Sequence, residues 1–383
     1  MTNGLARLLA LVQAVLAARV AWRLFRSGGE APIRPVPAGT VPPDCVGVLV
    51  PVLNEAQRLG TCLAGLQAQG AELAEVLVID GGSRDGTCDL VRAYARRDRR
   101  VRLVEAGPAP AGWNGKVWGL HMGERAVAPS THWVLTIDAD VRPRPALARS
   151  LVARARSRHL RLLSVATAQR LSGRLEGVLH PALLATLVYR FGRPGVATSR
   201  PDQVLANGQC CLVRRDLLGR VGGFEAVRDS LCEDVTLARL AAAVGDAVGF
   251  YEADGLVEVR MYPGWRETWR NWPRSLATRD RLFGTRGWLG LLEVALLQAL
   301  PLPLLLLGWR SGALRRVNVL LVGVRVGVLV GMARAYPGRP WTYWLSVLAD
   351  LPAALAVWRS ALARHHTWRG RSYSREKGSL VTV

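Results

Sequence analysis

Long apolar runs lie toward the two ends of the chain, and shorter apolar blocks alternate with polar segments between them. The first run, residues 4–25, is mostly apolar and is interrupted by Arg7 and Arg19. Its length suits a bilayer span, which takes about 20 residues, and arginines near its ends could extend toward the headgroups. We therefore predict a membrane anchor over residues 1–26, with a surface-lying amphipathic helix as the alternative. A linker rich in proline and glycine, residues 27–44, follows it.

Three further apolar runs are long enough to span a membrane, and tryptophans and tyrosines flank them. They cover residues 288–309, 317–336 and 341–362, and predict C-terminal transmembrane helices within residues 288–363. Pro301 and Pro303 lie inside the first run, which could instead be re-entrant or a shallow hairpin. The remaining residues, 364–383, are a basic polar tail that we expect to be disordered after Tyr373.

Each of these three runs contains one ionisable residue: Glu293, Arg325 and Asp350. A charge inside a membrane is costly and is usually paired within a helix bundle. We therefore predict that Arg325 contacts Asp350 or Glu293.

Between the apolar ends, strand-like and helix-like segments alternate. Residues 46–52 are almost continuously apolar, as in a parallel strand that is buried on both faces. Strands at 75–79, 101–105 and 135–140 and helices at 56–69 and 87–97 complete the predicted pattern. Alternation at this spacing is typical of a doubly wound α/β domain with a mostly parallel sheet, which we place at residues 45–260.

The segment Leu135–Asp140 is predicted to be a buried strand that ends in two carboxylates. Because strand side chains alternate, Asp138 and Asp140 would share one face at the carboxyl end, where open α/β sheets bind ligands. Two hard oxygen donors suit Mg²⁺ or Mn²⁺. An ordinary pair of turn aspartates is the alternative.

Composition narrows the choice of partner. The chain of 383 residues has a formal net charge of +22, carried almost entirely by arginine, since Lys116 and Lys377 are the only lysines. The arginines are scattered and do not interleave with aromatic residues, which favours an anionic membrane surface or a phosphorylated substrate over nucleic acid. The six cysteines have no C-x-x-C spacing and are expected to be free thiols in a reducing compartment. No cleavable signal peptide is evident.

Several short motifs occur in a recognisable order. They are Pro51-x-x-Asn54-Glu55, Asp80-Gly-Gly-Ser83-x-Asp85-Gly86-Thr87, Asp138-x-Asp140 and Glu233-Asp234. Together they resemble the family 2 glycosyltransferases of GT-A fold over residues 45 to about 280. Five further segments more narrowly resemble membrane-bound enzymes that glycosylate carotenoids, the chlorobactene and diaponeurosporenoate glycosyltransferases. They also resemble hopanoid-associated glycosyltransferases. These segments are Gly112–Lys116, Ala206–Gln209, Gly222–Arg228, Glu233–Arg239 and Met261–Trp265.

The resemblance implies roles for the first motifs in holding a nucleotide sugar. It assigns Asp140 to the metal, Asp138 to the metal and ribose, and Asp80 to the base, although Gly81 stands where the family more often has a second aspartate. The nucleotide-sugar set is Pro51, Asn54, Glu55, Asp80, Ser83, Asp85, Lys116 and Asp138. Alternatively, Gly81–Gly86 is a plain turn. Lys116, an isolated lysine in an arginine-rich chain, could supply a point charge to a phosphate or sugar oxygen, or simply be solvated.

Glu233 and Asp234 are expected to open an apolar helix, where carboxylates are also favoured by the helix dipole. By resemblance, Asp234 is the general base that accepts the acceptor's proton, and Glu233 orients the acceptor or Asp234. Inversion at the anomeric carbon would follow. Candidate acceptor or diphosphate residues are Asn207, Gln209, Trp265, Arg270 and Arg274.

Residues 261–287 are predicted to be interfacial amphipathic helices. Trp265, Trp269 and Trp272 would form one stripe, at the headgroup level or, alternatively, at the acceptor site. Processive relatives often carry Q-x-x-R-W here, and this chain does not, which argues against polymer synthesis.

The sequence thus predicts a membrane-bound inverting glycosyltransferase. It would move a hexose, such as glucose from a UDP-linked donor, to a lipid acceptor with the help of Mg²⁺ or Mn²⁺. A carotenoid-type terpenoid is the favoured acceptor, and hopanoids or polyprenyl lipids are the alternatives. A basic membrane-surface or nucleic-acid-binding protein with a degenerate transferase body is the alternative of another class, although we expect no nucleic-acid partner. The catalytic domain should face the cytoplasm at the bacterial inner membrane. Four full spans would then place the basic tail outside, against the positive-inside rule, so the number of spans stays open.

Overall fold

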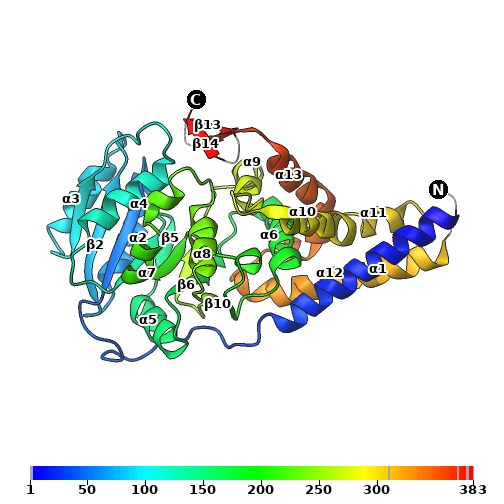
Figure 1. Ribbon diagram of the computed structural model, residues 1–383, viewed down its shortest axis with the longest axis horizontal. Helices are drawn as coiled ribbons and strands as arrows, with labels where there is room; N and C mark the ends of the chain where they lie inside the picture. The colour runs from blue at the N-terminus through cyan, green and yellow to red at the C-terminus, as the bar shows by residue number, and fades with distance from the viewer. Residues whose placement is uncertain (1–2, 309–310, 369–370, 377–378, 383) are drawn as a thin grey trace.

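A computed structural model describes residues 3–308, 311–368, 371–376 and 379–382. Its catalytic body is built on a large sheet with the strand order β3-β2-β1-β4-β9-β6-β10-β8 (Figure 1). Strands β1, β2, β3 and β4 are mutually parallel, and β9 runs against both β4 and β6. The bounds are β1 Val46–Val52, β2 Leu73–Asp80, β3 Val101–Glu105, β4 Trp133–Ile137, β6 Leu162–Ala166, β8 Val196–Thr198, β9 Cys210–Arg214 and β10 Val248–Glu252. The carboxyl ends of the first four strands therefore meet at one edge.

Helices cover both faces of this sheet. Val48 and Val50 of β1 face a core shared with α2 (Ala56–Gln67) and α5 (Leu147–Ser157). Leu49, between them, faces the opposite core with α4 (Gly115–Ala126) and α8 (Glu233–Ala243). This alternation is why β1 is apolar along its whole length, and it confirms the predicted doubly wound α/β architecture.

The strand that carries the aspartates is shorter than predicted. It ends at Ile137, and Asp138 and Asp140 lie in the turn between β4 and β5 (Val141–Pro143). The Val141 N–H donates to the Asp138 carbonyl over 3.1 Å, which closes that turn. β5 pairs with β11 (Val257–Val259), which also pairs with β7 (Ala168–Gln169), so a small second sheet fixes the turn. The remaining short elements of the body are α3 Thr87–Ala95, α7 Arg215–Arg220, η1 Pro201–Gln203 and η2 Phe224–Val227.

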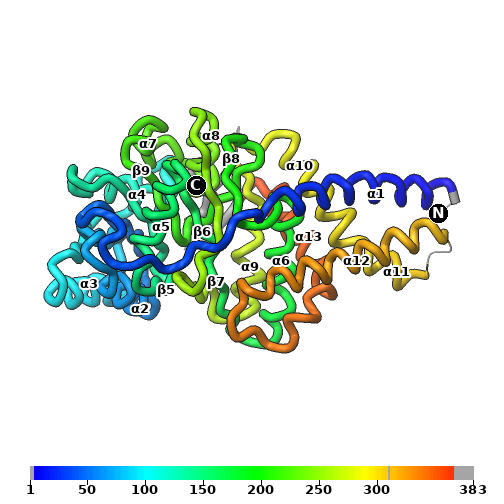
Figure 2. Tube along the Cα trace, turned by 90° about the horizontal axis from the view of Figure 1, so that it is seen from below, coloured from blue at the N-terminus to red at the C-terminus, as the bar shows by residue number. Residues whose placement is uncertain are grey.

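A second helical layer adjoins the sheet and extends away from it as an apolar arm (Figures 1 and 2). Among the described residues, four helical segments of this layer are long and apolar enough to cross a membrane: residues 4–26, 284–306, 312–335 and 341–362. The elements of this layer are α1 Asn3–Arg26, α6 Arg174–Phe191, α9 Trp265–Leu276, α10 Gly284–Glu293, η3 Val294–Ala299, α11 Pro301–Leu306, α12 Gly312–Met332, η4 Ala333–Ala335, η5 Trp341–Ala349 and α13 Asp350–Leu362.

Helix α6 was not anticipated in this layer, because its sequence lies inside the region predicted for the catalytic domain. Ala182 and Leu183 of α6 nevertheless pack in one core with Trp272, Leu291 and Ala353, which belong to α9, α10 and α13. The apolar run around Leu183 is the feature of the sequence that could have predicted this buried helix. Through α6, the catalytic sheet and the C-terminal helices are one continuous structure.

Buried polar contacts hold the apolar helices together. Arg325 Nε lies 2.9 Å from Asp350 Oδ2, which confirms one of the two predicted pairings, and both side chains are almost fully buried. Glu293 instead binds Arg19 and Arg23 of α1, at 2.8 Å and 2.9 Å. Arg19 is therefore an ion-pair partner rather than a headgroup contact, and α1 is fastened to the C-terminal bundle.

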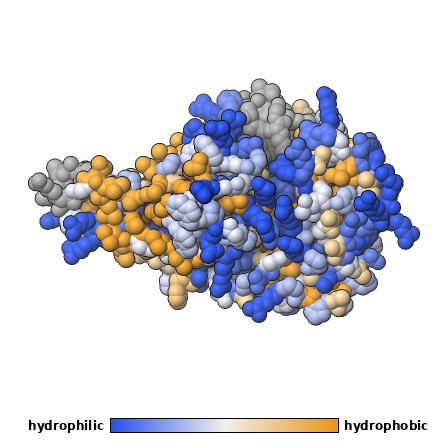
Figure 3. All heavy atoms as spheres, turned by 180° about the vertical axis from the view of Figure 1, so that it is seen from behind, coloured by the Kyte–Doolittle hydropathy of each residue, from blue (hydrophilic) through white to orange (hydrophobic). Residues whose placement is uncertain are grey.

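The arm has a consistent direction. Helices α1 and α12 both begin at its far end and run toward the catalytic body, whereas α10 to α11 runs outward (Figures 1 and 2). Segment Trp341–Leu362 lies beside α6 and α9 at the body end, as its shared core shows. Exposed apolar side chains cover the arm (Figure 3), among them Leu8, Leu11, Val15, Leu306, Val319 and Leu320.

Two predicted irregular segments contain ordered structure. The linker is fixed to the sheet edge at Ile33, which is buried and whose N–H donates to the Glu252 carbonyl over 2.8 Å. The tail was expected to be disordered after Tyr373, and this is wrong for its described residues. They form an antiparallel sheet of β12 (His365–Trp368), β13 (Arg371–Glu376) and β14 (Ser379–Thr382).

Candidate active site

A single cavity of about 1650 Å³ lies at the carboxyl edge of the large sheet and continues to the apolar helices. It reaches from the turn after β4 past α4 and α8 to α6, α9 and α12. Eleven of the residues singled out from the sequence line it: Pro51, Asn54, Glu55, Lys116, Asp138, Asp140, Asn207, Gln209, Glu233, Asp234 and Arg274. The motifs that are distant in sequence thus meet in one place.

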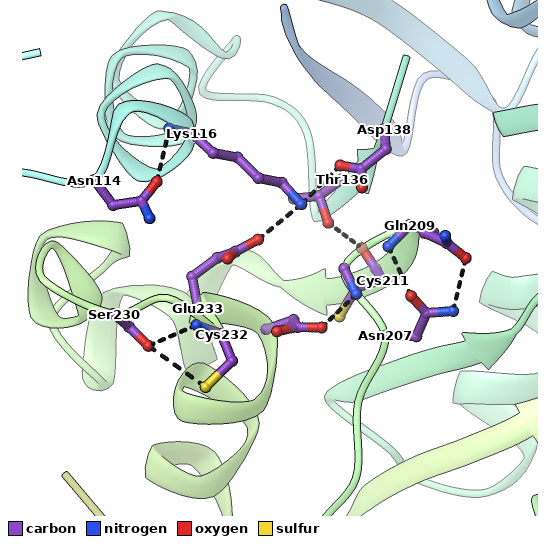
Figure 4. Close-up of polar contacts among 12 residues, drawn as sticks. Asn114, Lys116, Thr136, Asp138, Asn207, Gln209, Cys211, Ser230, Cys232 and Glu233 are labelled. Atoms are coloured by element: carbon purple, nitrogen blue, oxygen red, sulfur yellow. Dashed lines mark hydrogen bonds and ion pairs between the residues drawn. The ribbon is translucent and has the colours of Figure 1, made fainter. Parts of the chain in front are cut away.

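Lys116 is the centre of the polar end of this cavity. It stands in the first turn of α4, where the Asn114 side chain caps the helix by accepting the Lys116 N–H over 2.9 Å. Its Nζ lies 2.7 Å from Asp138 Oδ1 and 2.8 Å from Glu233 Oε1 (Figure 4). Burial alone would lower the pKa of Lys116, but the carboxylates of Asp138, Glu233 and Asp234 outweigh it and raise that pKa. The ammonium is therefore a permanent positive charge.

Asp234 is held beside this charge at the N-terminus of α8, as predicted. Its Oδ2 accepts the Gly208 backbone N–H over 2.6 Å. Burial, followed by the charge of Glu233, raises the pKa of Asp234 to about 7. A carboxylate with a pKa near neutrality that faces a cavity is suited to accept a proton.

Gly208 was not among the predicted site residues, although its motif was recognised. A Cβ at this position would lie 3.0 Å from Lys116 Nζ, 3.1 Å from Glu233 Oε1 and 3.3 Å from Asp234 Oδ2. Glycine at this position lets the backbone approach these three charged groups without displacing them.

Buried ion pairing also fixes the helix that carries Asp234. Arg239 Nη1 lies 2.6 Å from Asp280 Oδ1, and the Thr236 hydroxyl donates to Asp280 Oδ2 over 3.0 Å. These contacts tie α8 to the segment after α9, so that the two sides of the cavity are held at a set distance. No spacing in the sequence predicts the Arg239–Asp280 pair.

The turn after β4 carries the donors for a cation. Burial and then the charge of Asp138 raise the pKa of Asp140 to about 7, while Arg58, with Nη1 at 4.0 Å, opposes the shift. Two carboxylates that destabilise each other's charge in a partly buried turn fit a divalent cation. Among the described residues, no group of three or more acidic, histidine or cysteine side chains could hold a metal ion. Two carboxylates still suit Mg²⁺ or Mn²⁺, which usually take one or two carboxylates and complete their shell with water and phosphate oxygens.

The first two motifs are joined into one wall of the cavity. Asn54 adopts a positive φ of 55°, its N–H donates to Ser83 Oγ over 2.8 Å, and its Oδ1 accepts the Arg84 N–H over 2.9 Å. The Ala56 N–H donates to Asp85 Oδ2 over 3.1 Å. Ser83 and Asp85 thus brace the loop and do not line the cavity.

Asp80 also stabilises the turn that follows β2. Its carboxylate accepts the N–H groups of Gly82 and Ser83 over 2.9 Å and 3.0 Å, while the adjacent Gly81 lines the cavity. The plain-turn alternative considered for this run is therefore present in the structure, and a direct contact between Asp80 and a base remains a prediction.

The remaining candidates divide into two groups. Asn207 and Gln209 line the cavity, and Asn207 Nδ2 donates to Gln209 Oε1 over 3.1 Å. The Thr167 hydroxyl is hydrogen-bonded to both side chains. On α9, Arg274 and Trp272 face the cavity, whereas Trp265 and Arg270 do not line it. The predicted tryptophan stripe at headgroup level is thus wrong for Trp272, which is buried with its ring 3.9 Å from that of His180.

Comparison with known proteins shows which families this chain resembles. Residues 47–222 match the family model described as Glycosyl transferase family 2. A mannosyltransferase from Pyrobaculum calidifontis, solved in complex with GDP-mannose and Mn²⁺, aligns with a TM-score of 0.55 and 19% identity. The alignment covers 94% of this chain and 99% of that one, and it shows a shared fold.

Two curated relatives match over shorter segments. The lipopolysaccharide core biosynthesis glycosyltransferase LpsC of Rhizobium meliloti is 33% identical over 93 residues, which are 24% of this chain and 29% of that protein. Glycosyltransferase AglE of Haloferax volcanii is 27% identical over 84 residues, 21% of this chain and 28% of that protein. The chain thus matches less than a third of the length of either relative. Residues 47–222 are thus similar to family 2 glycosyltransferases, and the chain has the GT-A fold.

Proposed function

We propose that this protein transfers a hexose from a nucleoside diphosphate sugar to a lipid acceptor at the membrane. One observation carries the proposal: a single cavity is bordered at one end by Lys116, Asp138, Asp140 and Asp234 and at the other by apolar membrane helices. The polar end suits a sugar diphosphate, and the apolar end suits an acceptor that is insoluble in water.

The reaction requires an acceptor oxygen to lose its proton while a diphosphate leaves the anomeric carbon. Asp234, held by the Gly208 N–H, is the base that takes the proton, and Glu233 keeps Lys116 directed into the same space. A base on one side of the sugar and a leaving group on the other invert the anomeric centre. Asp138 and Asp140 would hold Mg²⁺ or Mn²⁺, which neutralises charge on the leaving diphosphate.

UDP-glucose is the donor we favour, on the resemblance carried by the Asp80 motif. The Pyrobaculum enzyme binds GDP-mannose, so both donors belong in the test. A carotenoid-type terpenoid with a hydroxyl or carboxyl group is the favoured acceptor, and a hopanoid or polyprenyl lipid is the alternative. The ordered contacts of Lys116, Asp138 and Asp234 speak against a degenerate transferase body in a membrane-surface or nucleic-acid-binding protein.

The fold also supports a topology. If α1, the α10–α11 segment and α12 cross the bilayer, residues 341–362 stay at the side of the catalytic body, near α9. The catalytic domain and the basic tail then share the cytoplasmic face of a bacterial inner membrane, in agreement with the positive-inside rule. Protease-protected N-terminal tags and accessible C-terminal tags in inside-out vesicles are expected.

The test combines donor turnover with lipid analysis. Purified protein in mild detergent is given UDP-glucose or GDP-mannose with Mg²⁺ or Mn²⁺ and an apolar extract of cells that carry its gene. A metal-dependent gain of one hexose mass on an apolar lipid, abolished by EDTA, is expected. Transfer only to water-soluble acceptors, or no cleavage of either donor, would refute the proposal.

A further inference from the structure

The catalytic cavity continues well beyond Asp234 into the membrane helices. Its far part is lined by apolar residues of α6 on one side and α12 on the other, with the end of α1 beside them. These residues are Leu24, Phe25, Leu184, Leu187, Val188, Val324, Gly327, Val328, Gly331 and Met332. Because α12 is long and apolar enough to cross a membrane, this part of the cavity lies where a lipid chain could reach it.

Two glycines shape the α12 wall. Gly327 and Gly331 are four residues apart, and therefore on one face of the helix. A Cβ at either position would meet no heavy atom within 4 Å. Neither has a positive φ, so the backbone does not require glycine there.

Close packing against another helix is the usual reason for glycines in a membrane helix, and no helix in the described part of this chain packs against these two. Glycine also weakens a helix relative to alanine. What the two glycines do provide is width: side chains at these positions would project into the cavity that continues to Asp234.

We propose, resting on the proposed function, that the Gly327–Gly331 face of α12 receives the hydrocarbon part of the acceptor and limits its width. The chain of the acceptor lies between α6 and α12, and its hydroxyl or carboxyl end points to Asp234. Continuity of the cavity from this face to the proton-accepting carboxylate identifies the occupant as the acceptor rather than a structural lipid.

Leucine substitutions at Gly327 and Gly331 test whether the width of the cavity at this face limits the acceptor. Gly327→Leu and Gly331→Leu add a side chain into open space, so the fold should tolerate them. Gly323→Leu is the matched control, since it lies one turn earlier on the same helix, also meets no atom within 4 Å, and does not line the cavity. Each full-length protein is assayed for hydrolysis of the nucleotide sugar without lipid, and for hexose transfer to the apolar cell extract.

Gly327→Leu and Gly331→Leu should reduce transfer to lipid at least tenfold and leave lipid-independent hydrolysis within twofold of wild type. Gly331→Ala should be intermediate, and Gly323→Leu should retain both activities. Transfer by Gly331→Leu within twofold of wild type, or an equal loss in Gly323→Leu, would overturn the inference. Loss of hydrolysis together with a lowered Tm would show misfolding, and Gly331→Ala then decides: a wild-type transfer rate in that variant overturns the inference.

A competition experiment tests whether bulk membrane lipid, rather than the acceptor, occupies the Gly327–Gly331 face. A fiftyfold excess of dioleoyl phosphatidylglycerol over the extract should leave wild-type transfer unchanged. Inhibition that disappears in Gly331→Leu would assign the face to bulk membrane lipid and overturn the inference. Failure of the proposed function looks different: wild type would hydrolyse the donor and transfer hexose to no apolar lipid.

Discussion

The Lys116 ammonium lies 2.7 Å from Asp138 Oδ1, and this contact joins the start of α4 to the turn after β4. The same ammonium lies 2.8 Å from Glu233, at the start of α8. One positive charge therefore organises three separate segments of the chain around the polar end of the cavity. It also leaves the local charge negative, because Asp138, Glu233 and Asp234 all act on it. A divalent cation bound there would offset this negative charge and that of a diphosphate.

Replacing this lysine tests its role. Lys116→Met keeps much of the side-chain volume and removes the charge, so the carboxylates of Asp138 and Glu233 lose their shared partner. Loss of one preorganised charge at a reacting group typically costs about 10²–10³-fold in kcat. We expect a loss of that size in donor turnover. Arg125→Met, an exposed cation in the last turn of the same helix, should keep wild-type kinetics, and similar losses in both variants would contradict the assignment.

Asp234→Asn tests the general base. The amide is nearly isosteric but cannot take a proton, and general-base catalysis contributes about 10²–10⁴-fold. Transfer should fall by that factor, while nucleotide binding, measured by titration calorimetry, stays within a few fold of wild type. Asp89→Asn on the exposed side of α3 serves as the control, since its carboxylate is 83% exposed. Near-normal turnover by Asp234→Asn would reject its role as base.

The raised pKa of Asp234 predicts how the rate of transfer depends on pH. Burial, and then the charge of Glu233, bring this pKa to about 7, so the carboxyl keeps its proton to higher pH than a free aspartate. Only the deprotonated form accepts a proton. Activity should therefore rise with pH to a plateau above about 7 and fall about tenfold per pH unit below it. Glu233→Gln removes the neighbouring charge and should move the inflection to lower pH; a flat profile of kcat/KM from about pH 5 to 8 would disagree.

Gly208→Ala tests the close approach of the backbone to the site. The added Cβ would lie 3.0 Å from Lys116 Nζ and 3.1 Å from Glu233 Oε1, so these side chains or the turn that contains Gly208 must shift. Because the Gly208 N–H holds Asp234, a displacement of this kind should lower kcat more than it raises KM for the donor. Gly219→Ala, where a Cβ meets no atom within 4 Å, should be neutral. Equal kinetics in both variants would mean that this approach is not needed.

The sequence predicted those parts of the site that depend on local pattern. Asp138 and Asp140 were found because the carboxyl end of a buried parallel strand is where an open α/β sheet binds ligands. Asp234 was found through the family resemblance of its motif. The pattern could not decide whether Asp80 stabilises its own turn or contacts a ligand, since an aspartate in either role looks alike in sequence. Nor could it place α6 beside α13, or Gly208 against Lys116, because these contacts depend on packing between distant segments.

The Arg325–Asp350 pair allows a test of the helix bundle that is independent of catalysis. Both side chains are almost fully buried, Arg325 also donates to Ser346 over 3.1 Å, and Gln298 donates to Asp350 over 2.8 Å. Arg325→Leu leaves a buried carboxylate without its guanidinium, which typically costs about 3–5 kcal/mol. A lower Tm in detergent and poor membrane expression are therefore expected.

Replacing both Arg325 and Asp350 distinguishes the effect of an unpaired buried charge from the effect of altered side-chain packing. In Arg325→Leu combined with Asp350→Leu, no unpaired charge remains, so much of the lost stability should return, as it does when buried ion pairs are replaced by apolar residues. Arg316→Leu, an exposed arginine on the same helix, should change stability by less than about 0.5 kcal/mol. If the double variant were as unstable as the sum of its single variants, the two charges would be acting on separate partners. Recovery of Tm together with normal donor hydrolysis would instead show that this pair serves the fold of the arm and leaves the chemistry to the cavity around Lys116.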